Sequence, residues 1–171
     1  MINKKEEIKI SLFHVEQRVF TYSYYIGEAQ RNSGIPLKLA ASIQASSDDH
    51  VQINDHINIA ISELVKIINN YFCICKYDLE KDNTHEEHSI LKLIVTPPQY
   101  FPNNMLDELQ KTMTTYLVMR TLQQWILQHK PDEASITTAE TEKTVIQLRQ
   151  LMNCRVKPQK AKQRVRNNIE I

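Results

Sequence analysis

The spacing of the apolar residues changes along this chain, and this limits the fold more than any other feature. Before Tyr71, apolar positions recur every three or four residues in two long stretches, as on one face of a helix. From Tyr71 to Thr96 they alternate around a polar loop, as in two strands, and helical spacing returns after Pro102. We therefore predict an α+β fold that is mostly helical, with four main helices, one β-hairpin and an extended basic C-terminal tail.

The boundaries of these elements follow from capping and breaking residues. Ser47-Asp48-Asp49 has the composition of a helix N-cap, and Pro97, Pro102 and Pro131 interrupt the pattern. Residues 7–13 alternate weakly, which is compatible with a short strand, and residues 37–47 are ambiguous. The predicted helices and hairpin occupy residues 15–31, 50–70, 71–96 (the hairpin), 103–129 and 132–154.

The predicted hairpin carries two of the three cysteines. Tyr71, Cys73, Cys75, Tyr77 and Leu79 would share one face of its first strand. The spacing of Cys73 and Cys75 does not match a common zinc motif, so we expect free thiols that are buried like small apolar side chains.

Length and composition indicate a single globular domain. The chain has 171 residues, of which 42% are apolar and 24% charged, and it has no apolar run of the ~18 residues that a membrane span needs. We expect no membrane association and see no signal peptide. Only Gly27 and Gly34 are glycines, which excludes the glycine-rich dinucleotide and P-loop motifs and the nucleophile elbow of hydrolases.

Three groups of side chains are candidates for chemistry. The pair His85 and His88 would bind a metal if it lay on a helix, but a solvated hairpin loop is the simpler interpretation. An acidic and histidine-rich group would bind Mg²⁺ or act in acid–base catalysis, although acids are also common at a helix N-terminus. Its members are Asp48, Asp49, His50, Asp55 and His56. Three tyrosines of the first helix would stack on bases or, more simply, pack in a core or interface: Tyr22, Tyr24 and Tyr25.

Charge divides the chain into a body, residues 1–154, and a C-terminal arm, residues 155–171. The body carries 15 Lys and Arg against 19 Asp and Glu, a net −4, while the arm carries six against one, a net +5, which together give +1. Such an arm cannot bury enough surface to fold alone, so it is either a solubilising end or a contact for a partner subunit or nucleic acid. We expect it to lie along a subunit of a different protein. Its partner-binding residues would be Arg155, Lys157, Pro158, Lys160, Lys162, Arg164 and Arg166.

The predicted helix 103–129 is apolar on most sides, which is typical of a helix buried on several sides. Tyr116, Leu122, Trp125 and Ile126 are its candidate core or interface residues. The helix has more apolar surface than one small domain would readily bury, which favours a subunit interface.

Residues 48–158 carry a family resemblance. The segments that carry it are Ala60-Ile61-Ser62-Glu63-Leu64-Val65, Tyr116-Leu117-Val118-Met119-Arg120-Thr121-Leu122-Gln123-Gln124-Trp125, Lys130-Pro131-Asp132-Glu133-Ala134 and Leu148-Arg149-Gln150-Leu151-Met152-Asn153-Cys154-Arg155-Val156-Lys157-Pro158. With a hairpin that ends in Pro97-Pro98, this order resembles head–tail connector, or ring (adaptor), proteins of tailed phages of Bacteroidetes, including crAss-like phages.

The resemblance implies a structural virion protein that is neither an enzyme nor a cofactor-binding protein. It implies a homo-oligomeric ring of about twelve copies below the portal, assembled in the host cytoplasm, with a terminal arm inserted into the portal. Portal, tail or other ring proteins and genomic DNA would be its partners. Two other classes stay open from the residues: a nucleic-acid-binding regulator that uses the basic tail, and a small metal-binding protein or enzyme.

Overall fold

The computed structural model describes residues 5–81 and 89–155, and 69% of these residues are helical. It confirms the mostly helical fold with four main helices and one small antiparallel sheet. The elements are β1 (Glu6–Ser11), α1 (Leu12–Asn32), α2 (Leu37–Ala41), α3 (His50–Asn69), β2 (Cys73–Lys81), β3 (Ser89–Thr96), α4 (Leu106–His129) and α5 (Ala134–Asn153). The pair His85 and His88 and the arm from residue 156 onward lie outside the described residues.

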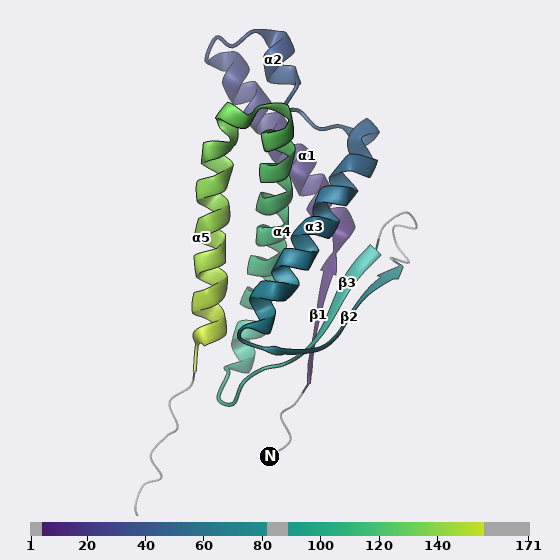
Figure 1. Cartoon of the computed structure of the whole chain (residues 1–171), viewed down its shortest axis with the longest axis vertical. Helices are drawn as coiled ribbons and strands as arrows, with labels where there is room; N and C mark the ends of the chain where they lie inside the picture. The colour runs from purple at the N-terminus through teal and green to yellow at the C-terminus, as the bar shows by residue number, and fades with distance from the viewer. Residues whose placement is uncertain (1–4, 82–88, 156–171) are drawn as a thin grey trace, which may run out of the picture.

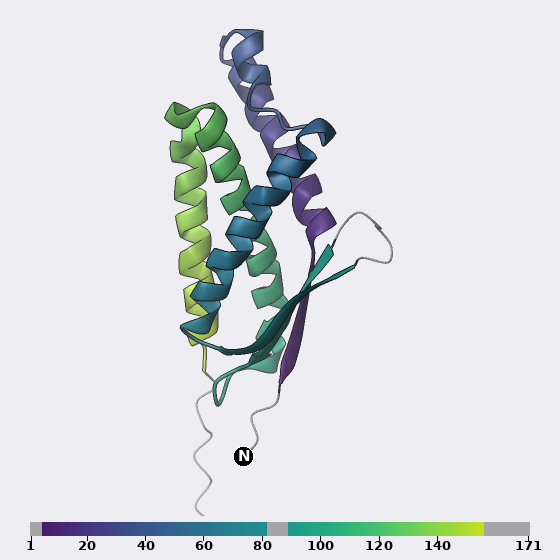
Figure 2. The same cartoon turned by 45° about the vertical axis from the view of Figure 1, so that its right-hand side comes forward.

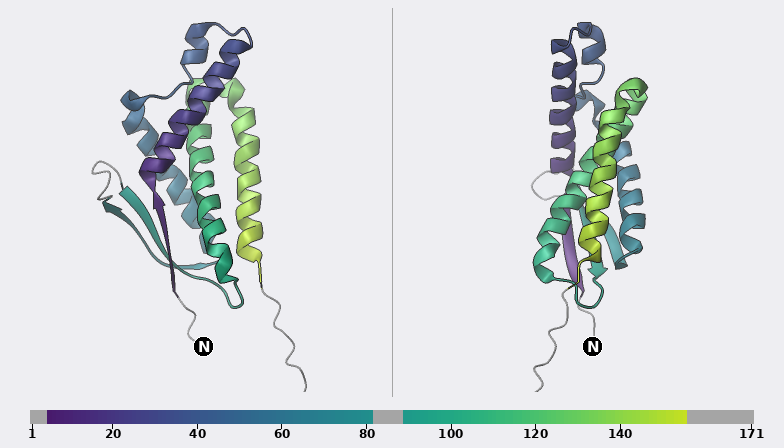
Figure 3. Two further views of the ribbon diagram at one scale, coloured as in Figure 1. Left: turned by 180° about the vertical axis from the view of Figure 1, so that it is seen from behind. Right: turned by 90° about the vertical axis from the view of Figure 1, so that its left-hand side faces the viewer.

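Helix α4 is the central element of the molecule (Figure 1). It packs against α1, α3 and α5, and it also contacts β1. The sheet lies beside one end of this helical layer, while α2 and the end of α1 project beyond the other end (Figures 1 and 2). Seen from behind, α1 continues directly from β1 and crosses α4 (Figure 3). All four main helices therefore share one core.

The sheet has three strands in the order β1-β3-β2, so the predicted hairpin gains a third strand from the N-terminus. Ile8 and Ile10 of β1 lie opposite Leu93 and Leu91 of β3, and all four side chains are buried against the helices. The N-terminal segment alternates as expected for a strand, but it ends at Ser11. The Ser11 hydroxyl accepts a hydrogen bond from the His14 amide (3.5 Å), which begins α1 earlier than predicted.

A register shift in β2 changes which of its residues share a face, so the predicted face of the first strand is wrong in part. Between Ile74 and Lys76 the pairing with β3 slips by one residue, which reverses the alternation of side chains at that point. Cys73 therefore lies on the opposite face from Tyr77 and is exposed, so the prediction that it is a buried thiol is wrong. The thiol is free, as expected.

The apolar surface of α4 is buried within the chain itself. Its buried side chains include Leu109, Met113, Leu117 and Val118, together with the four candidates named from the sequence. Of its large apolar side chains, Leu127 alone is exposed, with 43% of its surface accessible. The expectation that α4 needs a second subunit to cover it is wrong, because four other elements of the same chain surround it.

Candidate functional site

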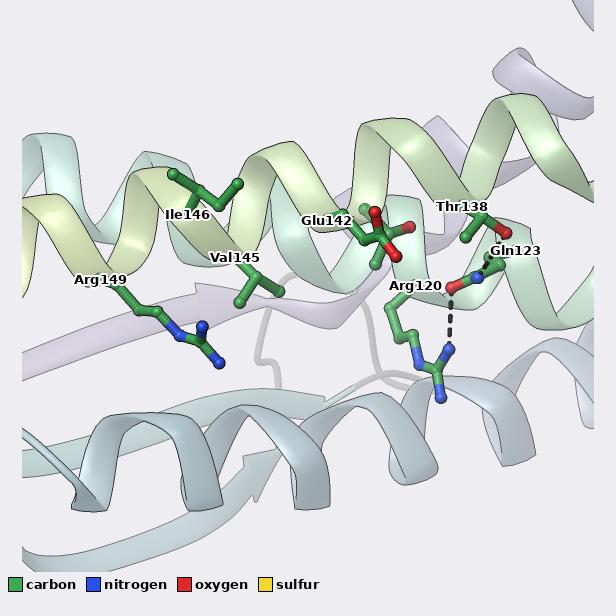
Figure 4. Close-up of a pocket in the computed structure, with 8 residues that line it drawn as sticks. Arg120, Gln123, Thr138, Glu142, Val145, Ile146 and Arg149 are labelled. Carbon is green, nitrogen blue, oxygen red and sulfur yellow. Dashed lines mark hydrogen bonds between the residues drawn. The ribbon is translucent and has the colours of Figure 1, made fainter.

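A groove runs between α5 and α3 above α4, and charged side chains of α4 and α5 line it (Figure 4). It has a volume of about 410 Å³. Its lining residues are Arg120 and Gln123 of α4 and Thr138, Thr141, Glu142, Val145, Ile146 and Arg149 of α5. A second groove of about 540 Å³ shares Ile146 and Arg149 and continues along α5 to Cys154. The two grooves together extend along α5 from Thr138 to Cys154.

Arg120 joins α4 to α3 at the floor of this groove. Its Nε and Nη2 atoms donate to Glu63 Oε2 and Oε1 at 2.6 and 2.8 Å, so the guanidinium and the carboxylate meet through two parallel hydrogen bonds. The hydroxyl of Tyr116 donates to the same Glu63 Oε2 at 3.3 Å. Two-point pairs of this kind fix orientation as well as distance, because both groups are planar.

The same arginine reaches α5 through a glutamine. Arg120 Nη1 donates to Gln123 Oε1 at 2.8 Å, and Gln123 Nε2 donates to the Thr138 hydroxyl at 2.8 Å. Thr138 also donates to the carbonyl of Ala134 at 2.8 Å, which fixes the hydroxyl for this contact. The network therefore spans three helices whose residues are 57 and 15 positions apart along the chain.

Ionisation in the network is shifted toward the charged ion pair. Hydrogen bonding from Arg120 lowers the pKa of Glu63, and the carboxylate in turn raises the pKa of Arg120. Burial, helped by the negative charge of Glu63, raises the pKa of Tyr116 to about 12. At neutral pH the phenol therefore stays protonated and donates its hydrogen bond.

The groove has limited capacity for an added anion. Three donors of Arg120 already have partners, whereas Arg149 has no ion-pair partner among residues 5–81 and 89–155. Glu142 and the apolar Val145 and Ile146 line the same groove as Arg149. The arrangement is suited to a mixed polar and apolar contact.

The four residues predicted as core or interface lie in the core of the chain. Tyr116, Leu122, Trp125 and Ile126 are each at most 2% exposed. Trp125 Nε1 donates to the carbonyl of Ile43 at 2.7 Å, and its ring stacks on His129 with 3.9 Å between ring centres. These side chains hold α4 to its neighbours and do not form an open binding surface.

The acidic and histidine-rich group is dispersed in the structure. Asp49 accepts a hydrogen bond from the Ser46 amide (2.8 Å) in a capping box before α3. His50 Nδ1 lies 2.5 Å from the buried carboxylate of Glu16, and His56 Nε2 lies 3.1 Å from Gln128 Oε1. Among the described residues, no three His, Cys, Asp or Glu side chains lie together as metal ligands would.

The three tyrosines of α1 separate into one packed and two exposed side chains. Tyr22 packs against the core, and Arg18 lies over its ring at 5.8 Å. Tyr24 and Tyr25 are 52% and 62% exposed, so packing within the chain does not account for them.

The β2 edge is a second candidate surface, which the sequence analysis did not identify. Tyr77 and Leu79 lie opposite the buried Leu93 and Leu91, yet they are 55% and 47% exposed, because no helix of the described part of the chain covers them. The other face of β2 carries three charged side chains: Lys76, Asp78 and Glu80. The alternation correctly predicted that Tyr77 and Leu79 share a face, but it does not tell whether a helix covers that face.

Comparison with protein-family models, with curated proteins and with solved structures gives no match for this chain. None of the described helices is long and apolar enough to cross a membrane.

Proposed function

We propose that this chain is a structural protein of a tailed-phage virion, a subunit of a homo-oligomeric ring at the head–tail junction that links the portal to the tail. The observation that carries the proposal is the sequence resemblance over residues 48–158. In the structure, this region contains α3, the hairpin, α4 and α5, which pack as one body.

Two further observations support a role in assembly. The acidic body ends in an arm with a net charge of +5, which is typical of a segment that contacts a partner. The body also exposes an uncovered strand edge with two large apolar side chains, Tyr77 and Leu79. Uncovered edges of this kind are common sites of association between chains.

Deletion of residues 156–171 tests the proposal. We expect the shortened chain to fold, because the described core ends before the arm, and to be lost from virions and from complexes with the portal. A chain whose arm has the same composition in scrambled order is the control for charge alone, and a ring subunit with this arm should also be lost from virions. Absence of the full chain from purified particles would overturn the virion role.

The basic arm also favours a second candidate, a nucleic-acid-binding regulator. In that case the affinity of the full chain for DNA should fall steeply as salt rises, and the scrambled arm should bind as well as the natural one. A ring subunit requires the natural arm sequence for incorporation, so the scrambled variant separates the two functions.

A further inference from the structure

Strand β2 is an open edge of the sheet, whereas the opposite edge is engaged. At β1, Gln110 of α4 donates to the carbonyl of Lys9 at 2.7 Å, so a helix of the same chain occupies that side. No strand among residues 5–81 and 89–155 pairs with the outer side of β2. Near its centre, the Leu79 amide donates to the carboxylate of Asp78 at 3.0 Å. An incoming backbone carbonyl can replace this contact.

The open edge presents an acid–apolar–acid pattern, Asp78-Leu79-Glu80. Leu79 lies on the face that continues the core, and the two carboxylates lie on the opposite face. Asp78 pairs with Lys76 and Glu80 with Lys92, each at 2.9 Å, but both carboxylates are about half exposed and keep room for a second cation. Charges on an edge strand exclude most other strands, so a partner must complement them.

The C-terminal arm contains the complementary pattern, Arg164-Val165-Arg166. In an extended strand, side chains alternate between two faces, so both arginines would lie on one face and Val165 on the other. With Val165 opposite Leu79, the arginines fall opposite Asp78 and Glu80 in either strand direction. Opposite charges and an apolar pair at facing positions stabilise strand pairing.

The place where α5 ends favours a contact between the arm and another copy of the chain. Helix α5 ends on one side of the molecule, and strands β2 and β3 lie on the other, with α4 and α3 between them (Figures 1–3). A contact from the arm of one subunit to the β2 edge of the next is head-to-tail, and such contacts generate rings when the rotation closes.

We propose that residues 164–166 of one subunit add as a strand to the free edge of β2 in a neighbouring copy of the same chain. This inference rests on the proposed ring and names the contact between its subunits. The sequence alone favoured a different protein as the partner of the arm; the pattern at the β2 edge leads to a second copy instead.

Charge exchange in the full chain tests this contact. One variant carries D78R and E80R, and a second carries R164E and R166E. Each places like charges opposite one another, so we expect self-association, measured by analytical ultracentrifugation, to weaken about tenfold or more. The control D55R/E140R makes the same change in net charge as D78R/E80R, at exposed positions of α3 and α5, and should associate as the unmodified chain does.

Mixing the two variants identifies the donor. In the mixture, the basic arm of the D78R/E80R variant can meet the acidic β2 edge of the R164E/R166E variant, and the acidic arm of the second can meet the basic edge of the first. Association should therefore recover if arms pass between chains. Recovery only in a chain that carries all four substitutions would mean that the arm binds its own β2, and this would overturn the proposal. Association that resists both double substitutions would overturn it as well while leaving the ring intact.

A full chain that stays monomeric would also overturn the strand contact. The ring role would fall separately, if the chain were absent from purified virions. The two proposals can therefore fail independently.

Discussion

Arg120 holds Glu63 through two parallel hydrogen bonds of 2.6 and 2.8 Å, and this pair joins α4 to α3 at the floor of the groove. The two side chains are 26% and 33% exposed, so water screens the pair only in part. Because Gln123 continues the contact to α5, the network fixes three helices relative to one another. Its expected role is structural support for the groove.

Arg120→Ala should lower the free energy of unfolding by about 1–2 kcal/mol, since it leaves Glu63 without its two charged donors. Urea denaturation measures this change. Lys143→Ala is the matched control, because Lys143 and Glu140 form a 3.6 Å pair whose side chains are both more than half exposed. The control should change stability by less than about 0.5 kcal/mol, and equal effects of the two substitutions would contradict a supporting role for Arg120.

Tyr116 should be the last tyrosine to ionise as pH rises. Its pKa is raised from 10.0 to about 12, so the folded state keeps a proton that the unfolded state loses first. The associated stability is complete below pH 10.0 and is lost between pH 10.0 and about 12. Ultraviolet difference spectra should show a late tyrosinate step that Tyr116→Phe removes. Retention of that step in Tyr116→Phe would assign it to another tyrosine.

Trp125→Ala should cost about 3–5 kcal/mol, because it removes a buried ring and leaves the carbonyl of Ile43 without its donor. Trp125→Phe keeps most of the apolar volume but loses the 2.7 Å hydrogen bond, so a smaller cost of about 1–3 kcal/mol is expected. Trp125 is the only tryptophan, and its emission in the native chain should be that of a buried ring that shifts to longer wavelength on unfolding. An emission maximum typical of exposed indole in the folded chain would rule out this burial.

Gly27→Ala should destabilise the projecting end of α1 even though alanine favours helices. An added Cβ would lie 2.6 Å from Gln44 Cγ and 2.9 Å from the carbonyl oxygen of Ala40, and the backbone oxygen cannot move aside freely. Overpacking of this kind costs about 1–3 kcal/mol. Hydrogen exchange should show the loss of protection near α2, with little change in α5. Gln44→Ala in the same chain should relieve only the first of the two clashes.

Helical spacing predicted the four main helices because their apolar faces meet one core. The alternation also predicted the shared face of Tyr77 and Leu79, but it placed Cys73 on that face, since a single slip between Ile74 and Lys76 reverses the side chains across that point. The Glu63–Arg120 pair was also missed. Its partners are 57 positions apart, and no local spacing relates a glutamate of one helix to an arginine of another. Trp125 was identified, because a lone tryptophan within an apolar run is a strong signal of burial.

The order β1-β3-β2 also has a consequence for biosynthesis. Residues 6–11 are synthesised about 80 residues before their partners in β3, residues 90–95. The first strand must therefore wait for β3 before it can pair, and closing so long a loop costs conformational entropy. Until then its apolar side chains have no sheet to join, so the nascent β1 segment is open to chaperones and to premature contacts.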